Sequence, residues 1–524
     1  MKILTAAEMP EADRVTSQKF GVPSLTLMEN AGSAVAEFVL KSYPQAKTIG
    51  VICGKGNNGG DGFVAARKLR AAGRRVQILM LADPKELRGD ASKQFEGLTA
   101  KSVLARTPGQ LKSEPAGTVL ASDVLIDAIL GTGFKPPLNE LHAAAIERVN
   151  SSQRPVVAVD LPSGLTADES TASNAPFVRA DAIVTFTAPK PRLIFDPELA
   201  TSKLFIADIG SPPEAIQSKL ALEVITARDF EKALRPRPAD SHKGDYGHVL
   251  VIAGSAGKSG AAAMAGVAAL RAGAGLVTVA TPKSVQPLVA GFAAELMTEP
   301  LDETPEGTIS RRVLANLEKL INGKTVVALG PGLTTNSETV EFVREFVRQC
   351  SLPLVLDADG LNAFTGVSEK LNSANATKML FLTPHPGEMA RLLGCSTADV
   401  QKDRVRVARR FAQERGVVLV LKGFATLIAL RDGTVWVNPT GNPAMAKGGM
   451  GDVLTGMLAG MISQSTESAQ TQSLAAVYLH GLAGDLARDE ADEHTILATD
   501  LLKTLPRAFH VARERMGEKL IRIR

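Results

Sequence analysis

From residue 47 onward the chain alternates between two patterns of apolar and polar positions. Short apolar runs rich in β-branched residues predict strands, and glycine-containing turns connect them to segments with helical periodicity. Alternation of this kind predicts a parallel α/β sheet covered on both faces. Residues 1–46 are predicted to be mainly helical. The strands predicted in the first part of the chain are Thr48–Cys53, Arg75–Leu81, Val124–Ala128, Pro155–Val159, Ala182–Phe186 and Leu204–Ile209, with helices over Asn58–Ala72 and Leu138–Asn150.

The alternation stops at Ser211–Ser218, a segment with turn chemistry, and then starts again. We therefore predict a domain boundary near residue 220, with one domain over residues 1–218 and a second over residues 219–524. A length of 524 residues also exceeds what one compact core normally holds. The strands predicted in the second domain are His248–Ala253, Leu276–Ala280, Thr325–Leu329, Leu352–Leu356, Met379–Leu382 and Val417–Leu421, with a short strand pair around Thr426–Val437.

Composition and charge narrow the class of partner. A hydrophobic content of 45% with 22% charged residues is typical of a globular protein. The 59 basic and 55 acidic residues are spread along the chain, which predicts no nucleic-acid or membrane partner and favours a small anionic ligand. Three cysteines lie far apart and outside any CxxC pattern, and no apolar leader precedes residue 15, so we expect a reducing, cytoplasmic location.

In the first domain, polar and glycine-rich turns follow three predicted strands. Gly54–Gly62 is a candidate phosphate-binding turn, although a purely structural turn is the alternative. Because ligands bind outside the carboxyl ends of parallel strands, this turn should converge with Asp127–Phe134 and Asp160–Gly164. Oxygen atoms of Asn58, Asp127 and Ser163 are suited to a hard cation, and Asp160 is suited to acid or base chemistry on a substrate.

These three segments, GKGNNGGDGF, DAILGTGF and VDLPSG, closely resemble the N-terminal domain of NAD(P)HX epimerases, which interconvert the R and S forms of hydrated NADH and NADPH. The resemblance implies a Rossmann-like α/β sandwich and a bound potassium ion on Asn58, Asp127 and Ser163. One departure is Arg192, which stands where the family usually has glycine in a Lys-Pro-Gly-Leu segment. The residues that the resemblance places on the substrate are Asn57, Asn58, Gly59, Gly60, Asp61, Gly131, Thr132, Gly133, Phe134 and Asp160.

The second domain contains the most informative segment of the chain, the glycine-rich loop from Asn438 to Asp452. Glycines at the start of a predicted helix present backbone amides to an anion, and a carboxylate beside them can take a proton from a hydroxyl that meets a phosphate. The alternative is a glycine-rich loop capped by an aspartate. Four further segments follow predicted strands and should lie along the same sheet edge: Ala328–Leu333, Leu356–Asn362, Thr383–Glu388 and Leu421–Thr426.

Over nearly all of residues 225–510 these segments resemble the ADP- or ATP-dependent NAD(P)HX dehydratases, relatives of ribokinase-fold kinases. Ala444, Lys447 and Met450 replace the family's commoner Gly, Thr and Thr, and Thr334 replaces a glycine. The resemblance implies that the adenine nucleotide is held by Lys422, Gly423, Phe424, Ala425, Thr426 and Gly451. It implies that the hydrate is contacted by Ala253, Gly332, His385 and Asp452.

These resemblances predict a bifunctional repair enzyme that epimerises R- and S-NAD(P)HX and dehydrates the S form with ADP, giving AMP and phosphate. Asp452 would be the base of a Mg2+-assisted phosphoryl transfer, and Asp160 the catalytic group of the epimerase. The family also implies a homo-oligomer, a tetramer or an octamer. The choices between ADP and ATP and between NADHX and NADPHX stay open. The rival hypotheses are a small-molecule kinase of the ribokinase superfamily and a first domain that only binds or scaffolds.

Overall fold

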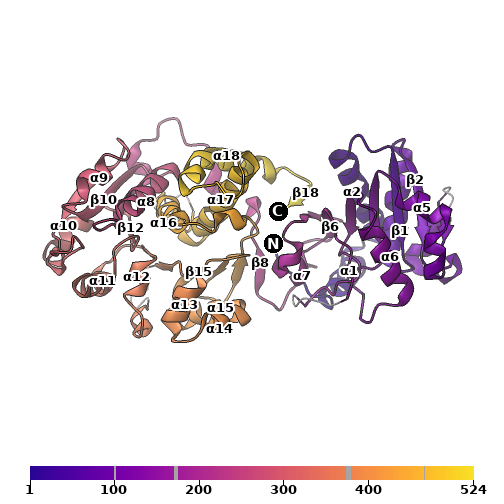
Figure 1. Cartoon of the computed structure of the whole chain (residues 1–524), viewed down its shortest axis with the longest axis horizontal. Coiled ribbons are helices and arrows are strands. Elements are labelled where there is room, and N and C mark those ends of the chain that lie inside the picture. Colours follow the sequence, from indigo (N-terminus) through magenta and orange to yellow (C-terminus); the bar gives the residue numbers. More distant parts are fainter. Residues whose placement is uncertain (99–101, 170–174, 373–378, 465–466) are drawn as a thin grey trace. The chain divides into compact units, whose positions relative to one another are not determined.

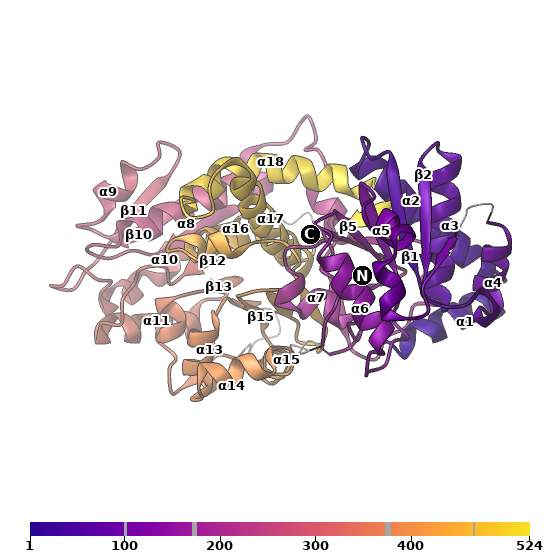
Figure 2. The same cartoon turned by 45° about the vertical axis from the view of Figure 1, so that its right-hand side comes forward.

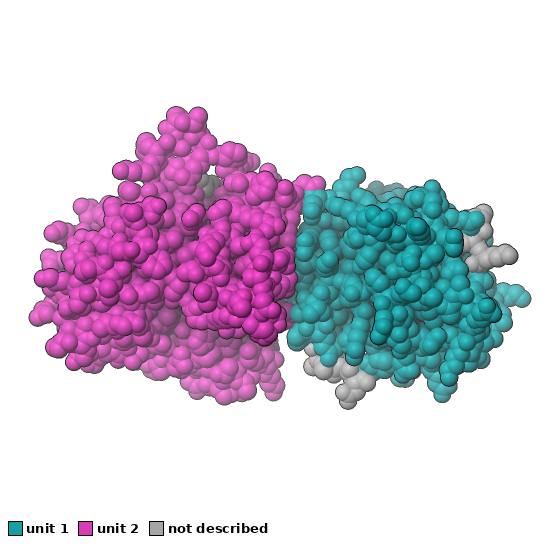
Figure 3. All heavy atoms as spheres, turned by 45° about the horizontal axis from the view of Figure 1, so that its top comes forward, with its two compact units in different colours: residues 1–220, 518–524 teal, residues 221–517 magenta. Residues whose placement is uncertain are grey.

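The computed structural model describes residues 1–98, 102–169, 175–372, 379–464 and 467–524. Within them the chain forms two compact units (Figure 3), one of residues 1–220 together with 518–524 and one of residues 221–517. No helix in these ranges combines the length and the apolar character needed to cross a membrane.

The first unit is built on a sheet in the order β18-β7-β6-β5-β4-β1-β2-β3, parallel except for β18 (Figures 1 and 2). Its strands are β1 (Thr48–Cys53), β2 (Arg75–Met80), β3 (Ser102–Leu104), β4 (Val124–Ala128), β5 (Val156–Val159), β6 (Ala182–Phe186), β7 (Lys203–Ala207) and β18 (Leu520–Arg522). Its helices are α1 (Glu8–Phe20), α2 (Ser24–Ser42), α3 (Asn57–Ala71), α4 (Gly89–Glu96), α5 (Glu114–Leu120), α6 (Glu140–Asn150) and α7 (Pro191–Phe195).

The strand order reverses between β1 and β4, and this reversal places the first candidate site. β1 leads towards β2 and β3 on one side, whereas β4 leads towards β5, β6 and β7 on the other. Connections that leave in opposite directions open a crevice at the carboxyl ends of the two strands. The turns that follow β1 and β4 meet there, since the amide of Gly54 donates to the carbonyl oxygen of Ala128 at 3.0 Å.

The last residues of the chain return to the first unit. β18 pairs antiparallel with β7, and Ile521 and Ile523 are buried there. The predicted division at 218/219 therefore differs from the observed one in two ways: the units divide at 220/221, and residues 518–524 do not belong to the second unit. The physical reason is that β7 would otherwise be an edge strand with unpaired backbone groups, and β18 covers it.

Removal of residues 518–524 tests this role. We expect the first unit to lose about 3 kcal/mol of stability, because two isoleucine side chains lose their burial and β7 loses its partner. Calorimetry should show the unfolding transition of the first unit at a lower temperature and that of the second unit unchanged. The exposed Lys519→Ala exchange is the matched control and should leave both transitions in place.

The second unit is built on a sheet in the order β11-β10-β9-β12-β13-β14-β15-β16-β17-β8, parallel from β11 to β15. Its strands are β8 (Leu222–Val224), β9 (His248–Ile252), β10 (Leu276–Pro282), β11 (Met297–Leu301), β12 (Val326–Leu329), β13 (Leu354–Leu356), β14 (Leu380–Leu382), β15 (Val418–Leu421), β16 (Leu427–Ala429) and β17 (Val435–Val437). Its helices are α8 (Ser259–Arg271), α9 (Gln286–Ala290), α10 (Leu317–Ile321), α11 (Ser337–Gln349), α12 (Asp359–Asn362), α13 (Pro386–Leu393), α14 (Thr397–Lys402), α15 (Arg404–Arg415), α16 (Met450–Ile462), α17 (Ala469–Glu490) and α18 (Ala498–Met516).

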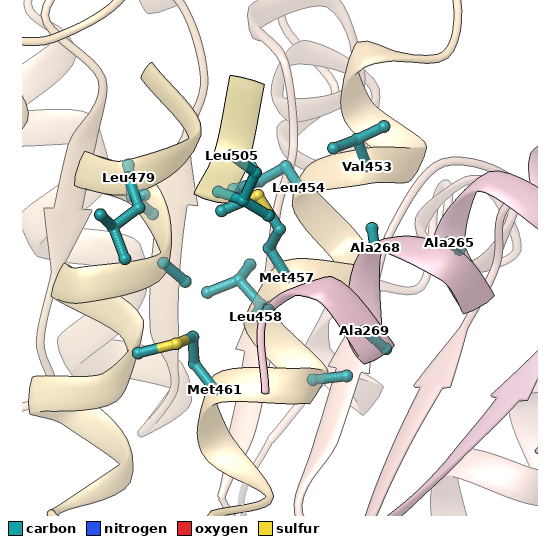
Figure 4. Packing of buried hydrophobic residues seen from close by; sticks show 14 of the residues in the cluster. Ala265, Ala268, Ala269, Val453, Leu454, Met457, Leu458, Met461, Leu479 and Leu505 are labelled. Atoms are coloured by element: carbon teal, nitrogen blue, oxygen red, sulfur yellow. The ribbon is translucent and has the colours of Figure 1, made fainter. Parts of the chain in front are cut away.

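Close packing of α16 on α8 positions the second candidate site (Figure 4). Both helices carry small residues at the contact. A Cβ atom on Gly456 would lie 2.0 Å from the carbonyl oxygen of Ala265, and one on Gly460 would lie 2.4 Å from that of Ala269. Asp452 lies one turn before Gly456 on the same helix face, so this contact determines where Asp452 points.

The predicted two-domain α/β fold is confirmed, and the sequence pattern located most of its strands. Several predicted strands are found with bounds that agree to within one or two residues, including the antiparallel pair β16 and β17. The pattern missed β3, β8, β11 and β18. Most of these are three-residue strands, too short for a period of two to stand out, and all but β8 hold residues exposed on the sheet's edge.

Candidate functional site

In the first unit the glycine-rich turn after β1 forms the start of α3. The helix begins at Asn57, so the NNGGD segment occupies its first turns, and from Asn58 to Asp61 these residues are buried while Asn57 is exposed. Gly59 has a packing reason to be glycine, because a Cβ atom there would lie 2.1 Å from the carbonyl oxygen of Gly54. The amides of this helix end point into the crevice between β1 and β4.

Oxygen atoms gather beside this helix start. Asn58 donates through its amide nitrogen to the carbonyl oxygen of Leu130 at 2.9 Å, while its Oδ1 is buried and accepts no hydrogen bond from the described residues. Ser163 Oγ donates to Asp127 Oδ1 at 2.6 Å and also accepts from the amide of Leu130 at 2.8 Å. Burial raises the pKa of Asp127 to about 6, against the hydrogen bonds from Ser163 and Ile129. The amide oxygen is buried and accepts no hydrogen bond from the described residues, and burial of the carboxylate charge is energetically unfavourable. Both groups are therefore suited to bind a cation.

Asp160 lies on the turn after β5 in a strained backbone conformation with φ of 66°. Its carboxylate is held from several sides: Lys190 Nζ lies 2.5 Å from Oδ1, Thr185 Oγ1 donates to Oδ1 at 3.0 Å, and the amide and hydroxyl of Thr132 donate to Oδ2. Burial alone would raise the pKa of Asp160, but the Lys190 charge and these hydrogen bonds hold it below the usual range. Asp160 is therefore ionised at neutral pH.

Two further carboxyl groups lie close enough to Asp160 to interact with its charge. Burial, followed by the charges of Asp160 and Asp13, raises the pKa of Asp61 well above its usual value. Asp13, on α1, also has a raised pKa, chiefly because of burial, and its Oδ1 is buried without a hydrogen-bond partner among the described residues. Neither Asp13 nor Lys190 is among the site residues predicted from the sequence.

In the second unit Asp452 lies in the first turn of α16, directly after the glycines of the Asn438–Asp452 loop. Burial, followed by the charge of Asp357, raises its pKa to about 6, and Lys422 acts in the opposite direction. Such a pKa suits a general base near neutral pH, since the group is ionised and still accepts a proton readily.

Asp357, at the end of β13, organises the charges around Asp452. It is buried, and it accepts from Lys422 Nζ at 2.8 Å and from Thr455 Oγ1 at 2.7 Å. Glu388 is the second carboxylate near Lys422, at 3.8 Å. Burial alone would lower the pKa of Lys422, but the charges of Asp357 and Glu388 outweigh it and raise that pKa. A Cβ atom on Gly451 would lie 3.4 Å from Lys422 Nζ, so glycine keeps the ammonium group open to a ligand.

The loop from Lys422 to Thr426 is held from behind by Arg404 at the start of α15. The guanidinium donates to the carbonyl oxygens of Leu421 at 3.2 Å and Lys422 at 3.3 Å, and also to that of Phe424. No carboxylate in the described ranges pairs with Arg404, and burial lowers its pKa to about 10. With these carbonyl groups turned towards Arg404, the other face of the loop is left for a ligand. The side chain of Phe424 in this loop is exposed.

Besides Asp452, three residues are predicted to contact the hydrate: Ala253, Gly332 and His385. Ala253 and Gly332 follow the adjacent strands β9 and β12, and their turns are joined by a hydrogen bond from the amide of Gly254 to the carbonyl oxygen of Pro331 at 2.8 Å. Ala253 is fully buried, so only its backbone is available. His385 caps α13, with Nδ1 accepting from the amide of Gly387 at 3.0 Å. This bond leaves Nε2 as the protonated ring nitrogen of the neutral form.

A family model described as NAD(P)H-hydrate dehydratase matches residues 249–507, and one described as YjeF-related protein N-terminus matches residues 24–192. The bifunctional NAD(P)H-hydrate repair enzyme Nnr of Moorella thermoacetica is 43% identical over 97% of this chain and 96% of its own length. The chain belongs to the bifunctional NAD(P)H-hydrate repair enzymes.

A second relative agrees with this membership. The Nnr enzyme of Escherichia coli is 34% identical over 96% of this chain and 93% of its own length. The crystal structure of an ADP/ATP-dependent NAD(P)H-hydrate dehydratase from Bacillus subtilis, co-crystallized with ATP/Mg2+, is 35% identical, covers 55% of this chain and 99% of its own, and has a TM-score of 0.47.

Three of the departures from the family pattern have a clear local environment in the structure. Arg192 lies within α7, where no glycine is needed, and its side chain forms an ion pair with Asp196 at 2.5 Å. Thr334 adopts φ of 71°, a conformation that suits the glycine usual in the family, and its amide donates to Asp359 at 2.8 Å. Lys447 does not turn to the anion loop: its ammonium group donates to the carbonyl oxygen of His494 at 2.5 Å.

The residues that the sequence missed are those that act through another residue. Lys190 and Thr185 hold Asp160, Asp357 holds Lys422, and Arg404 holds the loop behind Phe424. Lys190 lies 30 positions from Asp160, and Asp357 lies 65 positions from Lys422. Their role depends on contacts between residues that are distant in the sequence. Lys190, Thr185 and Asp357 lie at or near the end of a predicted strand, whereas Arg404 does not.

Proposed function

We propose that the first unit interconverts R- and S-NAD(P)HX and that the second unit dehydrates the S form with ADP, yielding NAD(P)H, AMP and phosphate. The observation that supports this most strongly is Asp452, a buried carboxylate at the start of α16 with a pKa raised to about 6 and with Lys422 close to it. Phosphorylation of a hydroxyl requires a base that takes the hydroxyl proton and, beside it, a cation that binds the phosphate.

The dehydration step follows from the chemistry of the leaving group. Hydroxide leaves C6 of the hydrated nicotinamide poorly, whereas phosphate leaves readily. The C6 oxygen attacks the terminal phosphorus of ADP as Asp452 takes the hydroxyl proton, and AMP departs. The C6–O bond then breaks with loss of phosphate, assisted by the electron pair of the ring nitrogen, and a proton leaves C5 to solvent, which restores the ring double bond. Lys422 and the amides at the start of α16 stabilise the charge on the transferred group.

Mg2+ would neutralise the charge of the nucleotide phosphates and align them for transfer. Among the described residues no group of three or more His, Cys, Asp and Glu side chains is placed to hold a metal ion. This agrees with a Mg2+ ion that is carried mainly by the phosphates, as is usual for this metal. The carboxylates close to Lys422 or Asp452 include Asp357, Asp359 and Glu388.

Potassium is the cation that we propose for the oxygen cluster of the first unit, with Asn58, Asp127 and Ser163 as its ligands. The fit depends on the buried Asn58 Oδ1, which accepts no hydrogen bond from the described residues, and on the carboxylate of Asp127. The cation would offset the burial of Asp127 and join the turns after β1, β4 and β5.

In the nucleotide site, Lys422–Thr426 and Gly451 are proposed to hold ADP, and Phe424 is the aromatic side chain exposed there for stacking. Ala253, Gly332 and His385 are proposed to contact the hydrate. The use of ADP rather than ATP, a tetrameric or octameric state and a cytoplasmic location stay predictions.

The decisive experiment follows both hydrates. Purified protein is incubated with mixed R- and S-NADHX, with and without ADP and Mg2+, and the hydrates are separated by chromatography. We expect R to S conversion without nucleotide, and recovery of NADH with free phosphate when ADP and Mg2+ are added. A stable phosphorylated product would support the kinase alternative, and unchanged R and S forms would support a binding role for the first unit.

The pH dependence of dehydration provides a further prediction. Because the pKa of Asp452 is raised to about 6, the carboxylate becomes protonated as the pH falls through 6 and can then no longer accept a proton. We expect kcat for dehydration to fall about tenfold per pH unit below pH 6 and to be level just above it. A flat kcat between pH 5 and pH 7 under saturating ADP would contradict the assignment.

A further inference from the structure

Lys190 lies underneath Asp160 and does not face the solvent. Its side chain is 0% exposed, whereas that of Asp160 is 14% exposed. Its ammonium group contacts Asp160 Oδ1 at 2.5 Å and Thr185 Oγ1 at 2.8 Å. A substrate that reaches Asp160 from the crevice therefore does not touch Lys190, which can act only through the carboxylate above it.

Three carboxyl groups interact with this one ammonium group. They come from separate elements: Asp13 from α1, Asp61 from the first turns of α3, and Asp160 from the turn after β5. Only Asp160 makes an ion pair with Lys190. No hydrogen bond donor in the described ranges serves the carboxyl group of Asp61, which is 9% exposed. Three carboxylates cannot all be ionised beside one cation in a buried site, so the ion pair decides which of them keeps its charge.

Epimerisation at C6 needs both a base and an acid. C6 carries a hydroxyl group and is bonded to the ring nitrogen, so its configuration is lost when the ring opens. A base takes the hydroxyl proton, the C6–N bond breaks as an aldehyde forms, and the electron pair stays on nitrogen, which an acid protonates. After rotation about the C5–C6 bond the nitrogen attacks the other face of the aldehyde, and both protons return. Atoms and electrons balance without an oxidant or a further reactant.

We propose that Lys190 is a positioning residue that keeps Asp160 as the base of the epimerisation and leaves Asp61 as its acid. The proposal depends on the epimerase function proposed above for the first unit. It assigns to Asp61 a catalytic role in addition to substrate contact, and to Asp13 the role of keeping the proton on Asp61.

The electrostatic environment of the two carboxyl groups supports this division. The charge of Lys190 and three hydrogen-bonded partners outweigh burial and hold the pKa of Asp160 below its usual value. Burial and the charges of Asp160 and Asp13 hold the pKa of Asp61 well above it, and Lys190 opposes them only in part. Carboxyl groups whose pKa values are pushed apart in one site are the usual basis for separate acid and base roles.

The test is the pH profile of epimerisation in the full chain, measured from pH 5.5 to 9.5 as R to S conversion of NADHX by chromatography. The acidic limb of the wild type lies below this range because the pKa of Asp160 is held below its usual value, and in Lys190→Met we expect the limb to move up into the measured range because no cation then offsets the burial of Asp160. At pH 6 we expect about a 100-fold loss of kcat, with KM within threefold of wild type because Lys190 does not touch the substrate. Lys190→Arg should return the limb towards its wild-type position.

Asp13→Asn is the matched variant that acts on the acid, Asp61, as Lys190→Met acts on the base, Asp160. Loss of its charge should lower the pKa of Asp61 and move the alkaline limb to lower pH, while the acidic limb shifts little. Dehydration of S-NADHX with ADP takes place in the second unit and should be unchanged, whereas the calorimetric unfolding transition of the first unit shows whether each variant is folded. Should Lys190→Met not fold, Thr185→Val removes one of the hydrogen bonds to Asp160 and should move the acidic limb in the same direction by less.

Two results would overturn the proposal. One is an acidic limb that stays in place in Lys190→Met although the rate falls, which is what a purely structural lysine would produce. The other is a loss that appears only in KM, which would mean that Lys190 binds the substrate. A wild-type protein that epimerises at no pH would contradict the epimerase function itself, and so the two failures are distinguishable.

Discussion

Replacing Asp452 with asparagine is expected to lower the rate of NADHX dehydration by about 10²–10⁴, because the hydroxyl of the hydrate then has no base at the start of α16. Asparagine keeps the size and most of the polarity of the side chain, so the loop and the helix should be unchanged. The measurement is recovery of NADH absorbance with saturating ADP and Mg2+.

The same chain contains the control for this variant. Epimerisation occurs in the other unit and should keep its wild-type rate, and an unfolding transition of the second unit no lower than that of the wild type excludes a folding defect around Asp452. The variant should also be more stable, because a carboxylate with a raised pKa opposes folding at pH values above that pKa. With the pKa of Asp452 near 6 we expect a gain of about 1–3 kcal/mol in the free energy of unfolding at pH 7.5. Dehydration at the wild-type rate would refute the assignment of Asp452 as the base.

Replacing Gly456 with alanine is expected to destabilise the second unit by about 3 kcal/mol or more. The new Cβ atom would lie 2.0 Å from the carbonyl oxygen of Ala265 and 2.8 Å from Ala268 Cβ, so α8 and α16 would have to separate. For a unit of this size the melting temperature should fall by about 10 °C, as measured by calorimetry. Dehydration should fall as well, since Asp452 lies one turn away on the same helix.

The matched control is Gly260→Ala on α8. A Cβ atom at Gly260 has no neighbour within 4 Å, and the exchange replaces a glycine near the start of a helix by a better helix former. We expect a gain of about 0.5–1 kcal/mol from this control. Equal melting temperatures for the Gly456 variant and the wild type would show that α8 and α16 are not as closely packed as Figure 4 indicates.

Much of the candidate chemistry was predictable because it lies at the carboxyl ends of parallel strands. Asp127 is the penultimate residue of β4, Asp160 follows β5, and Lys422 follows β15. Each strand had the apolar β-branched pattern of a buried strand. Once the sheet is parallel, these positions must share an edge. The order and spacing of such segments were also enough to indicate the family, which the comparisons confirm.

The position of the domain boundary was predictable only in part. The turn chemistry around Pro212 marked the end of the first domain to within a few residues of the observed division. The return of residues 518–524 was not predictable, since a three-residue strand has no periodicity of its own and its partner β7 lies some 300 positions earlier in the chain.

Read alone, the amino-acid sequence was sufficient for the two α/β units, the positions of most strands and the glycine-rich turns. It also predicted Asp160 and Asp452 as the catalytic aspartates, and these roles stay predictions. The charge state of those aspartates required the folded chain. Lys190 and the hydrogen bonds to Asp160 hold its pKa below the usual range despite burial. Burial, followed by the charges of Asp160 and Asp13, raises the pKa of Asp61, and burial, followed by the charge of Asp357, raises that of Asp452 to about 6. The physical reason is that strand and helix patterns are local, whereas burial and Coulomb interactions depend on which distant residues the fold brings together.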